Sequence, residues 1–446
     1  MQNTKVITNL STPPADATGE TLAAFLDTAP AIDLAAWLQT LPGSEMWRHL
    51  AALPLARRTK VFASLPPETQ ADLARAISPD SLAEIITWMD ADDRADLFND
   101  LTPTEQRQLT QNLAEEERND IRRLSAHAEG TAGAIMTSDY ATLDAGMTTL
   151  QAIAALRHQA SDKETIYRSF ILDHRQRLIG TLRLHELLLA ADDRLVTEIM
   201  DHAPISVPVD MDQEGVARAI ARYDVLALPV VDAEGRLLGI VTHDDAADAI
   251  EAETTEDFQK ISTVLPFTQS LRKAGIGVLY SRRIVWLALL VFGNLFSGAG
   301  IAYFEDTILA YVSLVFFLPL LIDSSGNAGS QSATLMVRAL ATGDVALKDW
   351  QNLIGRELVV AAALGATMAL VVLPLGALRG GSEIALVVGV TMFVLVIIGS
   401  LVGMSLPFLL SRLRLDPATA SGPLVTTISD AVGVVVYFLV ATLVLN

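Results

Sequence analysis

The C-terminal part of the sequence is constrained by a series of long apolar segments that carry almost no charge. Five segments have this property, with Asp323 and Asp430 as their only charged residues: 284–303, 307–336, 358–378, 384–411 and 417–446. A helix needs roughly 20 apolar residues to cross the hydrocarbon core of a membrane. A helix in a soluble protein rarely stays apolar on all sides over such a length. The pattern predicts an all-α domain of five transmembrane helices within residues 281–446.

Charge is distributed very unevenly along the chain. The net charge is −20, and residues 281–446 carry 8 basic and 9 acidic side chains, which leaves residues 1–280 at −19. Such an acidic excess argues against nucleic acid as a partner and favours cations. The sequence has no cysteine, so disulfides and thiolate metal sites are excluded.

Basic residues at the ends of the apolar segments predict the orientation in the membrane. All but Arg379 fall on the side of the acidic N-terminal half: Arg282, Arg283, Arg338, Lys348, Arg356, Arg412 and Arg414. Because basic residues concentrate on the cytoplasmic side, we expect a multi-pass protein of the plasma (inner) membrane, with residues 1–280 cytoplasmic and the C-terminus outside. Residues 1–12 lack an apolar core flanked by positive charge, so we expect no cleavable signal peptide.

Two domains and a connecting helix are predicted before the membrane segments. Residues 1–130 show short helical patterns that begin at Leu-Pro or Thr-Pro pairs, which indicates an α-solenoid-like helical domain. Residues 131–252 contain an internal repeat of about 60 residues: Ala134-Ile-Met-Thr137 recurs as Glu198-Ile-Met-Asp201, and Arg177-Leu-Ile-Gly180 recurs as Arg236-Leu-Leu-Gly239. Each copy reads helix, strand, charged turn, strand, helix, and the pair resembles two α/β CBS modules. We assign residues 253–280 to an acidic connecting helix, although the helical pattern already starts at His243.

Asp430 is the residue that most directly suggests a function. A carboxylate at membrane depth costs on the order of 3 kcal/mol on insertion scales, and all seven histidines lie in the N-terminal half. A transported cation is the simplest compensation, and the alternative is a protonated carboxyl group that is hydrogen-bonded inside the helix bundle. Thr426, one turn earlier, is predicted to face the same way.

A second group of polar positions lies in the segment around Asn327. Gly326-Asn-Ala-Gly329 either exposes backbone carbonyls to a water-filled path or packs helices tightly through small residues. Asp323 is either a ligand at the mouth of the path or a helix cap. Mg²⁺ prefers oxygen ligands and sheds its water reluctantly, so a site of carboxylate, carbonyl and hydroxyl oxygens suits the hydrated ion.

The membrane part of the sequence contains four distinctive motifs: Ser325-Gly-Asn-Ala-Gly-Ser-Gln-Ser-Ala-Thr-Leu-Met-Val-Arg-Ala-Leu-Ala341, Leu406-Pro-Phe-Leu-Leu410, Asp416-Pro-Ala418 and Pro423-Leu-Val-Thr-Thr-Ile-Ser-Asp430. These motifs resemble those of MgtE-type magnesium transporters. The order of helical domain, CBS pair, acidic helix and five spans is also similar. The resemblance implies a homodimer with an Mg²⁺ pore at its two-fold axis, and we expect Asp430, Gly326, Asn327 and Thr426 to line it. Asp323, where the family commonly has a small residue, adds a carboxylate near this pore. It also implies that the cytoplasmic domains close the pore when Mg²⁺ is plentiful.

Acidic residues of the N-terminal half are the candidates for the Mg²⁺ sensor. Charge alone favours a solvated acidic face, but resemblance to the family implies sensor ligands at Asp92, Asp96, Asp224, Asp245, Asp248, Glu253, Glu256, Asp257 and Asp416. Asp416 also reads as a helix N-cap before Pro417. Without Mg²⁺, facing carboxylates repel one another, and bound Mg²⁺ favours a compact, closed state.

Three other functions are compatible with parts of the sequence. Ser330 and Gly422 stand where the family often has asparagine, which leaves open a broader divalent transporter for Co²⁺, Mn²⁺ or Ca²⁺. A membrane-bound CBS sensor that transports nothing is less consistent with Asp430. CBS pairs often hold adenine nucleotides, so ATP is a possible ligand at Glu186 and Thr242. We expect no enzymatic activity, because the sequence shows no nucleophile–base pair, phosphate-binding loop or catalytic metal motif.

Overall fold

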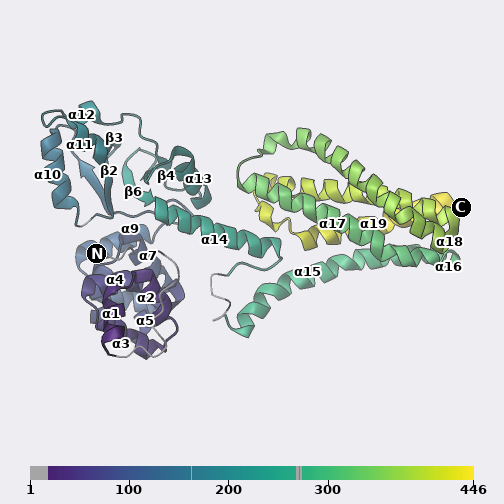
Figure 1. Ribbon diagram of the computed structural model, residues 1–446, viewed down its shortest axis with the longest axis horizontal. Coiled ribbons are helices and arrows are strands. Elements are labelled where there is room, and N and C mark those ends of the chain that lie inside the picture. Colours follow the sequence, from purple (N-terminus) through teal and green to yellow (C-terminus); the bar gives the residue numbers. More distant parts are fainter. Residues whose placement is uncertain (1–18, 162, 268–270, 272–273, 446) are drawn as a thin grey trace. The chain divides into compact units, whose positions relative to one another are not determined.

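The computed structural model describes residues 19–161, 163–267, 271 and 274–445, and residues 1–12, where no signal peptide is expected, lie outside these ranges (Figure 1). The chain divides into two units, Met1–Glu251 and Ala252–Asn446. The predicted fold class is confirmed: a helical N-terminal domain, an α/β CBS pair and an all-helical C-terminal domain are present.

The first domain is a stack of short helices. Within the described residues these are α1 (Glu20–Thr28), α2 (Ala31–Leu38), α3 (Gly43–Ala51), α4 (Leu55–Ala63), α5 (Pro67–Ala76), α6 (Pro79–Thr87), α7 (Ala91–Asp100), α8 (Pro103–Gln111) and α9 (Glu115–Leu124). Prolines stand at the N-cap or first turn of most of them, as predicted. Helices α2, α4, α6 and α8 pack in succession, as do α5, α7 and α9. This alternating contact around a core that includes Phe62 and Ile86 is the expected solenoid-like arrangement.

The CBS pair forms two three-stranded sheets of identical topology. In each sheet the first strand is parallel and the third antiparallel to the middle strand. The first sheet comprises β1 (Tyr140–Leu143), β2 (Thr165–Leu172) and β3 (Leu178–Arg183), and the second comprises β4 (Val207–Pro208), β5 (Ala227–Val231) and β6 (Leu237–Thr242). The helices are α10 (Thr149–Gln159), α11 (Leu184–Leu189), α12 (Val196–Ile199) and α13 (Gln213–Tyr223).

The repeated glycines of the two modules have a packing role that the sequence did not reveal. Thr137 bridges to Ile240 of β6, and Asp201 bridges to Thr181 of β3, so each repeated Ile-Met segment pairs with the final strand of a sheet. A Cβ on Gly239 would lie 2.7 Å from the carbonyl oxygen of Thr137, and one on Gly180 would lie 3.0 Å from that of Asp201. Glycine is therefore required for this close backbone approach.

Helix α14 (His243–Ile261) follows β6 directly, so the acidic helix begins ten residues before the assigned domain boundary at 253. It also ends earlier than expected, because Thr263 adopts a left-handed conformation (φ 56°) and Pro266 follows. Residues 276–280, assigned to the connecting helix from sequence, belong to the next long helix instead.

The second unit is built from long helices: α15 (Ile276–Tyr303), α16 (Glu305–Ala310), α17 (Ser313–Ala341), α18 (Trp350–Arg412) and α19 (Gly422–Leu445), with 3₁₀ turns η1 (Leu347–Asp349) and η2 (Pro417–Thr419). Among the described residues, three segments are long and apolar enough to cross a membrane: α15, η1 with α18, and α19. Gly381 (φ 82°) divides α18 into two helices, and Gly376 lies against Ala385 across the bend. With α17, this gives the five long helices that were predicted.

The segment Gly326–Gly329 is helical, so the expectation of an irregular loop that exposes carbonyl groups was wrong. It lies inside α17, where the carbonyls are engaged in the helix. The alternative, packing through small residues, is what the structure has. A Cβ on Gly329 would lie 2.7 Å from the carbonyl oxygen of Gly399, and Gly399 and Gly403 of α18 are in turn pressed against the carbonyls of Ser325 and Gly329. The helix-cap interpretation of Asp323 is also wrong, because this residue is in the middle of α17.

Candidate functional site

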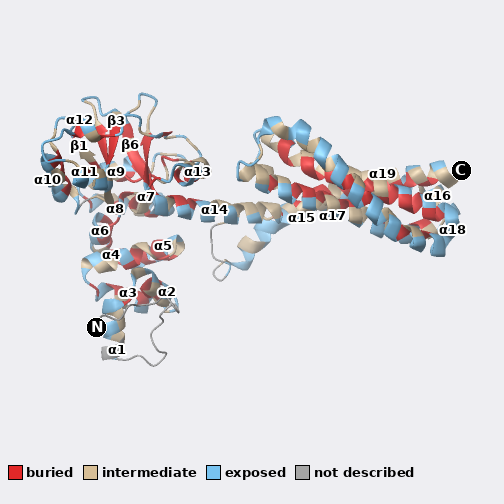
Figure 2. Ribbon diagram, turned by 45° about the horizontal axis from the view of Figure 1, so that its top comes forward, coloured by how far each residue is buried: buried red, intermediate tan, exposed pale blue. Residues whose placement is uncertain are grey.

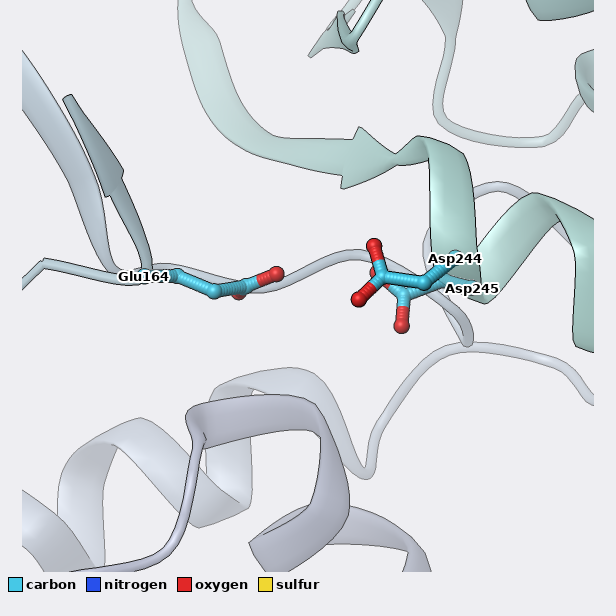
Figure 3. Close-up of side chains that lie close together, drawn as sticks. All are labelled: Glu164, Asp244 and Asp245. Atoms are coloured by element: carbon cyan, nitrogen blue, oxygen red, sulfur yellow. The ribbon is translucent and has the colours of Figure 1, made fainter. Parts of the chain in front are cut away.

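Three carboxylates meet where the CBS pair leads into α14. Asp244 and Asp245 stand in the first turn of α14, and Glu164 directly precedes β2 of the other module. Each offers an oxygen, and these oxygens all lie within 4.8 Å of one another. In Figure 3 the Glu164 side chain points toward the two aspartates across the gap between the modules. The side-chain oxygen of Thr242 lies 2.5 Å from a carboxylate oxygen of Asp244 and 2.5 Å from one of Asp245, and its single O–H donates to one of them at a time.

The first turn of α7 in the helical domain adds Asp92 and Asp93 to this group. We call the set Asp92, Asp93, Glu164, Asp244 and Asp245 the first acidic cluster. Among the described residues, Oδ1 of Asp92 and Oε2 of Glu164 are buried and have no hydrogen-bond partner. Arg94 bonds to Asp120 and Asp139 instead of to the cluster. Buried oxygens without partners fit a divalent cation, which prefers oxygen ligands.

Burial raises the pKa values of four members of the cluster, Asp92, Asp93, Glu164 and Asp245. The pKa of Asp93 rises to about 7 through burial and the charges of Asp90, Asp96 and Asp245. The pKa of Glu164 also rises to about 7, again through burial and then the Asp245 carboxylate. Burial and the charge of Asp245 hold the pKa of Asp92 well above its usual range. The folded chain therefore opposes full ionisation of this cluster in the absence of a cation.

The other sensor residues predicted in this unit are placed differently. Asp96 is exposed on α7, yet its pKa is raised to about 6 by desolvation and by the charges of Asp100 and Asp245, which connects it electrostatically to the cluster. Asp248 is exposed one turn beyond Asp245 and acts on Asp93 through its charge. Asp224 lies elsewhere, at the exposed C-cap of α13 in a left-handed conformation.

A second acidic cluster lies in the other unit, where α14 ends. It consists of Glu253, Glu256, Asp257 and Asp416, together with the ammonium group of Lys260. Burial raises the pKa of Asp257 to about 6, and the nearby charge of Asp416 adds to this effect. Asp416 caps η2 by accepting a hydrogen bond from the backbone N–H of Ala418 at 2.8 Å. The cap interpretation of Asp416 is thus confirmed for the 3₁₀ turn, while α19 itself begins at Gly422.

The predicted pore residues share one region of α17 and α19. Asp323 is the charged side chain that acts electrostatically on the half-buried Asp430. Asn327, one turn after Asp323, donates a hydrogen bond of 3.0 Å to its carboxylate, and both side chains are exposed on the surface of the single chain. Thr426 lies one turn before Asp430, and a Cβ on Gly326 would meet its methyl group at 2.8 Å. Gly326 therefore serves close packing of α17 on α19.

The residues considered for a nucleotide lie where the last strand of each module leads into a helix, Thr242 at the end of β6 and Glu186 three residues after the end of β3. Glu186 stands in the first turn of α11 and pairs with Arg183 at 2.5 Å. Thr242 ends β6 and is engaged with Asp244 and Asp245. Both side chains thus already have partners within the chain, and those of Thr242 belong to the first acidic cluster.

Sequence reasoning missed several members of the two clusters. Asp93 and Asp244 each adjoin a predicted residue in a first helical turn, so the Asp92-Asp93 and Asp244-Asp245 pairs were a usable signal. Lys260 could have been paired with Glu256 from their spacing of four residues. Glu164 has no local signal, because only the packing of β2 beside the other module brings it to α14.

Comparison with known proteins gives a consistent result over most of the chain. Residues 29–130 match the family described as the MgtE intracellular N domain, and residues 132–193 and 196–252 match the CBS domain. Residues 318–440 match the MgtE family of divalent cation transporters.

Individual relatives are similar over about three quarters of their length. The magnesium transporter MgtE of Thermus thermophilus is 41% identical over 329 residues, which is 74% of this chain and 73% of the relative. The magnesium transporter MgtE of Bacillus subtilis is 34% identical over 73% of this chain and 72% of its own. A crystal structure of the cytosolic domain of the Mg²⁺ channel MgtE with ATP is 37% identical, with a TM-score of 0.49, and covers 51% of this chain and 93% of that one.

The raised pKa values predict how stability depends on pH without divalent cations. Asp93 and Glu164 hold their protons up to about pH 7 when folded but lose them near pH 4 when unfolded. The folded state binds more protons in that window, so the free energy of unfolding falls as pH rises through it. With a chelator present, we expect the unfolding midpoint of the full chain to fall by about 5 °C or more between about pH 5 and pH 8. Circular dichroism in detergent measures this.

Two comparisons test the cause of that pH dependence. Mg²⁺ should restore the midpoint chiefly at the higher pH, where it replaces protons as the counterion of the carboxylates. The Asp93→Asn/Glu164→Gln variant should show a flatter pH profile in chelator. A profile with the same slope in the variant and the wild type would rule out these two groups as its origin.

Proposed function

This chain belongs to the MgtE family of magnesium transporters, and we propose that it conducts hydrated Mg²⁺ into the cell along the face of α17 and α19 that carries Asp430. The observation that carries this proposal is the pair Asp323 and Asp430 on neighbouring apolar helices, with Asn327 and Thr426 beside them. At membrane depth, a polar side chain that faces lipid costs free energy, whereas one that faces a water-filled path does not. The face they share is therefore best explained as the wall of an ion path.

The chemistry of this face suits a hydrated hard cation. Carboxylate, amide and hydroxyl oxygens are available, while all histidines lie before residue 244 and cysteine is missing from the sequence. Imidazole and thiolate ligands would favour zinc or copper. Oxygen ligands spaced around a water shell fit Mg²⁺, which exchanges its water slowly.

We infer that the transporter is a homodimer in the lipid membrane, with the path at the two-fold axis. The support is α15, which has no buried residue in a single chain, as Figure 2 shows by the lack of red along it. Within the described residues its main neighbour is α19. Because α15 is packed on one side, its other apolar surface can contact a second copy of the chain as well as lipid. Two copies would also bring two Asp430 carboxylates to one ion.

We place the protein in the plasma (inner) membrane with the N-terminal unit cytoplasmic and the C-terminus outside. The bias of Lys and Arg toward one side of the spans supports this orientation. In that orientation both acidic clusters sample the Mg²⁺ concentration inside the cell.

Cytoplasmic Mg²⁺ is proposed to close the path by binding these clusters. Like charges that are partly desolvated repel strongly, and a divalent ion removes this cost in the compact arrangement. An ion that binds one arrangement more tightly shifts the population toward it. The remaining sensor candidate, Asp224 at the exposed C-cap of α13, stays a prediction. ATP at Glu186 and Thr242 stays a prediction, since both side chains are engaged within the chain.

The first test concerns the path itself. Asp430→Ala should lower Mg²⁺ flux into proteoliposomes at least about tenfold, the factor that corresponds to 1.4 kcal/mol of lost interaction. The reason is that the ion loses its carboxylate ligand at membrane depth. Asp344→Asn, which neutralises an exposed acid outside the apolar helices, is the matched control. Wild-type flux through Asp430→Ala would refute the proposed path.

The second test concerns closure by cytoplasmic Mg²⁺. Glu164→Gln/Asp245→Asn should raise the Mg²⁺ concentration that half-inhibits flux by about tenfold or more, because the ion loses two ligands. Asp193→Asn removes an exposed carboxylate between α11 and α12, outside the cluster, and should leave this concentration unchanged. If the double variant and the wild type gave superimposable inhibition curves, the first acidic cluster would not be the sensor.

The third test decides between Mg²⁺ and a broader range of divalent ions. Asp323 adds a second carboxylate near Asp430, and a stronger anionic site favours ions that shed water more readily than Mg²⁺ does. Asp323→Asn should therefore lower Mn²⁺ and Co²⁺ flux several-fold relative to Mg²⁺ flux. Asp306→Asn, between α15 and α17, is the control. An unchanged flux ratio would show that Asp323 does not set selectivity.

A further inference from the structure

The ammonium group of Lys260 lies among the carboxylates of the second acidic cluster. Its Nζ bonds to the carboxylates of Glu256 and Asp416. Glu256 is one turn earlier on α14, whereas Asp416 is 156 residues away in sequence and belongs to the connection before α19. Lys260 thus ties the end of α14 to the membrane-spanning part of its own unit.

A backbone hydrogen bond fixes the orientation of the Asp416 carboxylate that bonds to Lys260. Its Oδ1 accepts a hydrogen bond from the N–H of Ala418 and so caps η2, while its Oδ2 accepts from Lys260. The two oxygens therefore have different partners, one fixed by the backbone and one supplied by α14. The Lys260 side chain is mostly shielded, with 21% of its surface exposed.

Apolar and backbone contacts hold the same turn of α14 in place. Ile261 packs against Val337, Ala418 and Ala420. Gln259 makes two hydrogen bonds with the backbone of Phe267, one as donor at 3.1 Å and one as acceptor at 2.8 Å. Lys260 therefore does not have to position the helix by itself, and its distinct contribution is its charge.

Among the described residues, this cluster brings one ammonium group together with four carboxylates. Both an ammonium and Mg²⁺ are compact, strongly hydrated cations that seek oxygen ligands. The ammonium is covalently attached, so its effective concentration at Asp416 is high and constant. A free divalent ion carries twice the charge but must displace the ammonium or share oxygens with it.

We propose that Lys260 is a built-in competitor of divalent cations at the second acidic cluster, and that it sets the Mg²⁺ concentration at which the path closes. The proposal rests on the proposed function, because it assumes that Mg²⁺ binding at these carboxylates closes the path. When Mg²⁺ is scarce, Lys260 partly neutralises Glu256 and Asp416. When Mg²⁺ is plentiful, the ion takes their oxygens, and the threshold is higher than it would be for the carboxylates alone.

This role predicts an effect opposite in sign to that of a structural latch. If Lys260 competes with Mg²⁺, its removal leaves a more negative site that binds Mg²⁺ more tightly, so closure needs less Mg²⁺. If Lys260 only secured α14, its removal would loosen the helix, and closure would need more Mg²⁺.

The experiment measures Mg²⁺ flux in proteoliposomes of the full chain while Mg²⁺ on the cytoplasmic side is varied. Lys260→Met should lower the half-inhibiting Mg²⁺ concentration by about tenfold, the effect of one nearby unit charge at a partly exposed site. Lys260→Arg keeps the charge and should stay near the wild type. Lys348→Met removes another lysine of the same unit, outside the cluster, and should have no effect. In an Asp416→Asn background, Lys260→Met should shift the midpoint much less.

The possible outcomes separate this proposal from the one it rests on. If cytoplasmic Mg²⁺ does not inhibit the wild type, the proposed gating fails. If Mg²⁺ inhibits the wild type but Lys260→Met has an equal or higher half-inhibiting Mg²⁺ concentration, the proposed gating stands and the proposed role of Lys260 is overturned. A second readout needs no flux measurement: the Mg²⁺ concentration at which the thermal unfolding temperature has risen by half of its maximal increase. Lys260→Gln replaces Lys260→Met if the latter does not fold.

Discussion

Repulsion between carboxylates that the fold brings together is the interaction on which the first unit depends. Asp92 lies on a helix of the solenoid, Glu164 directly precedes a strand of one CBS module, and Asp245 lies on the helix that follows the other module. Helices α7 and α14 share one apolar core through Ala91, Ala95 and Ala246, and β2 belongs to another, so these elements cannot move apart without loss of packing. The fold therefore imposes an unfavourable charge arrangement, which protons relieve at low pH and divalent cations relieve near neutrality.

The membrane unit depends on a complementary constraint, which is close backbone approach. Gly399 and Gly403 of α18 meet the carbonyls of Ser325 and Gly329 of α17, with no space for a Cβ. This contact fixes the rotation of α17, since its small residues must face α18. The opposite side of the helix then carries Asp323 and Asn327, which are exposed in the single chain. The small residues of α17 that pack against α18 thus determine which way Asp323 and Asn327 face.

Local sequence patterns were sufficient to predict the helices and strands, but they carry no information about contacts between residues far apart in sequence. The Pro-initiated helices, the CBS repeat and the apolar helices followed from short motifs and periodicity, because each is determined by neighbours in sequence. The contacts of Glu164 with Asp244 and of Lys260 with Asp416 could not be assigned in the same way, since they join residues that are 80 and 156 positions apart. The segment around Gly326 was misjudged as a loop because small residues permit irregular backbone as well as tight packing, and only the presence of α18 decides between them.

Helix α14 shows why two acidic clusters on one element need not act on each other directly. Asp245 and Asp257 are 12 residues apart on this helix, which at 1.5 Å per residue is roughly 18 Å. The Debye length at physiological salt is about 8 Å, so the charge at Asp245 is largely screened from Asp257. Any coupling between the clusters must then pass through the helix as a rigid body or through the free Mg²⁺ concentration that both experience. The two routes differ in a measurable way: only mechanical coupling would make neutralisation of one cluster change the Mg²⁺ affinity of the other.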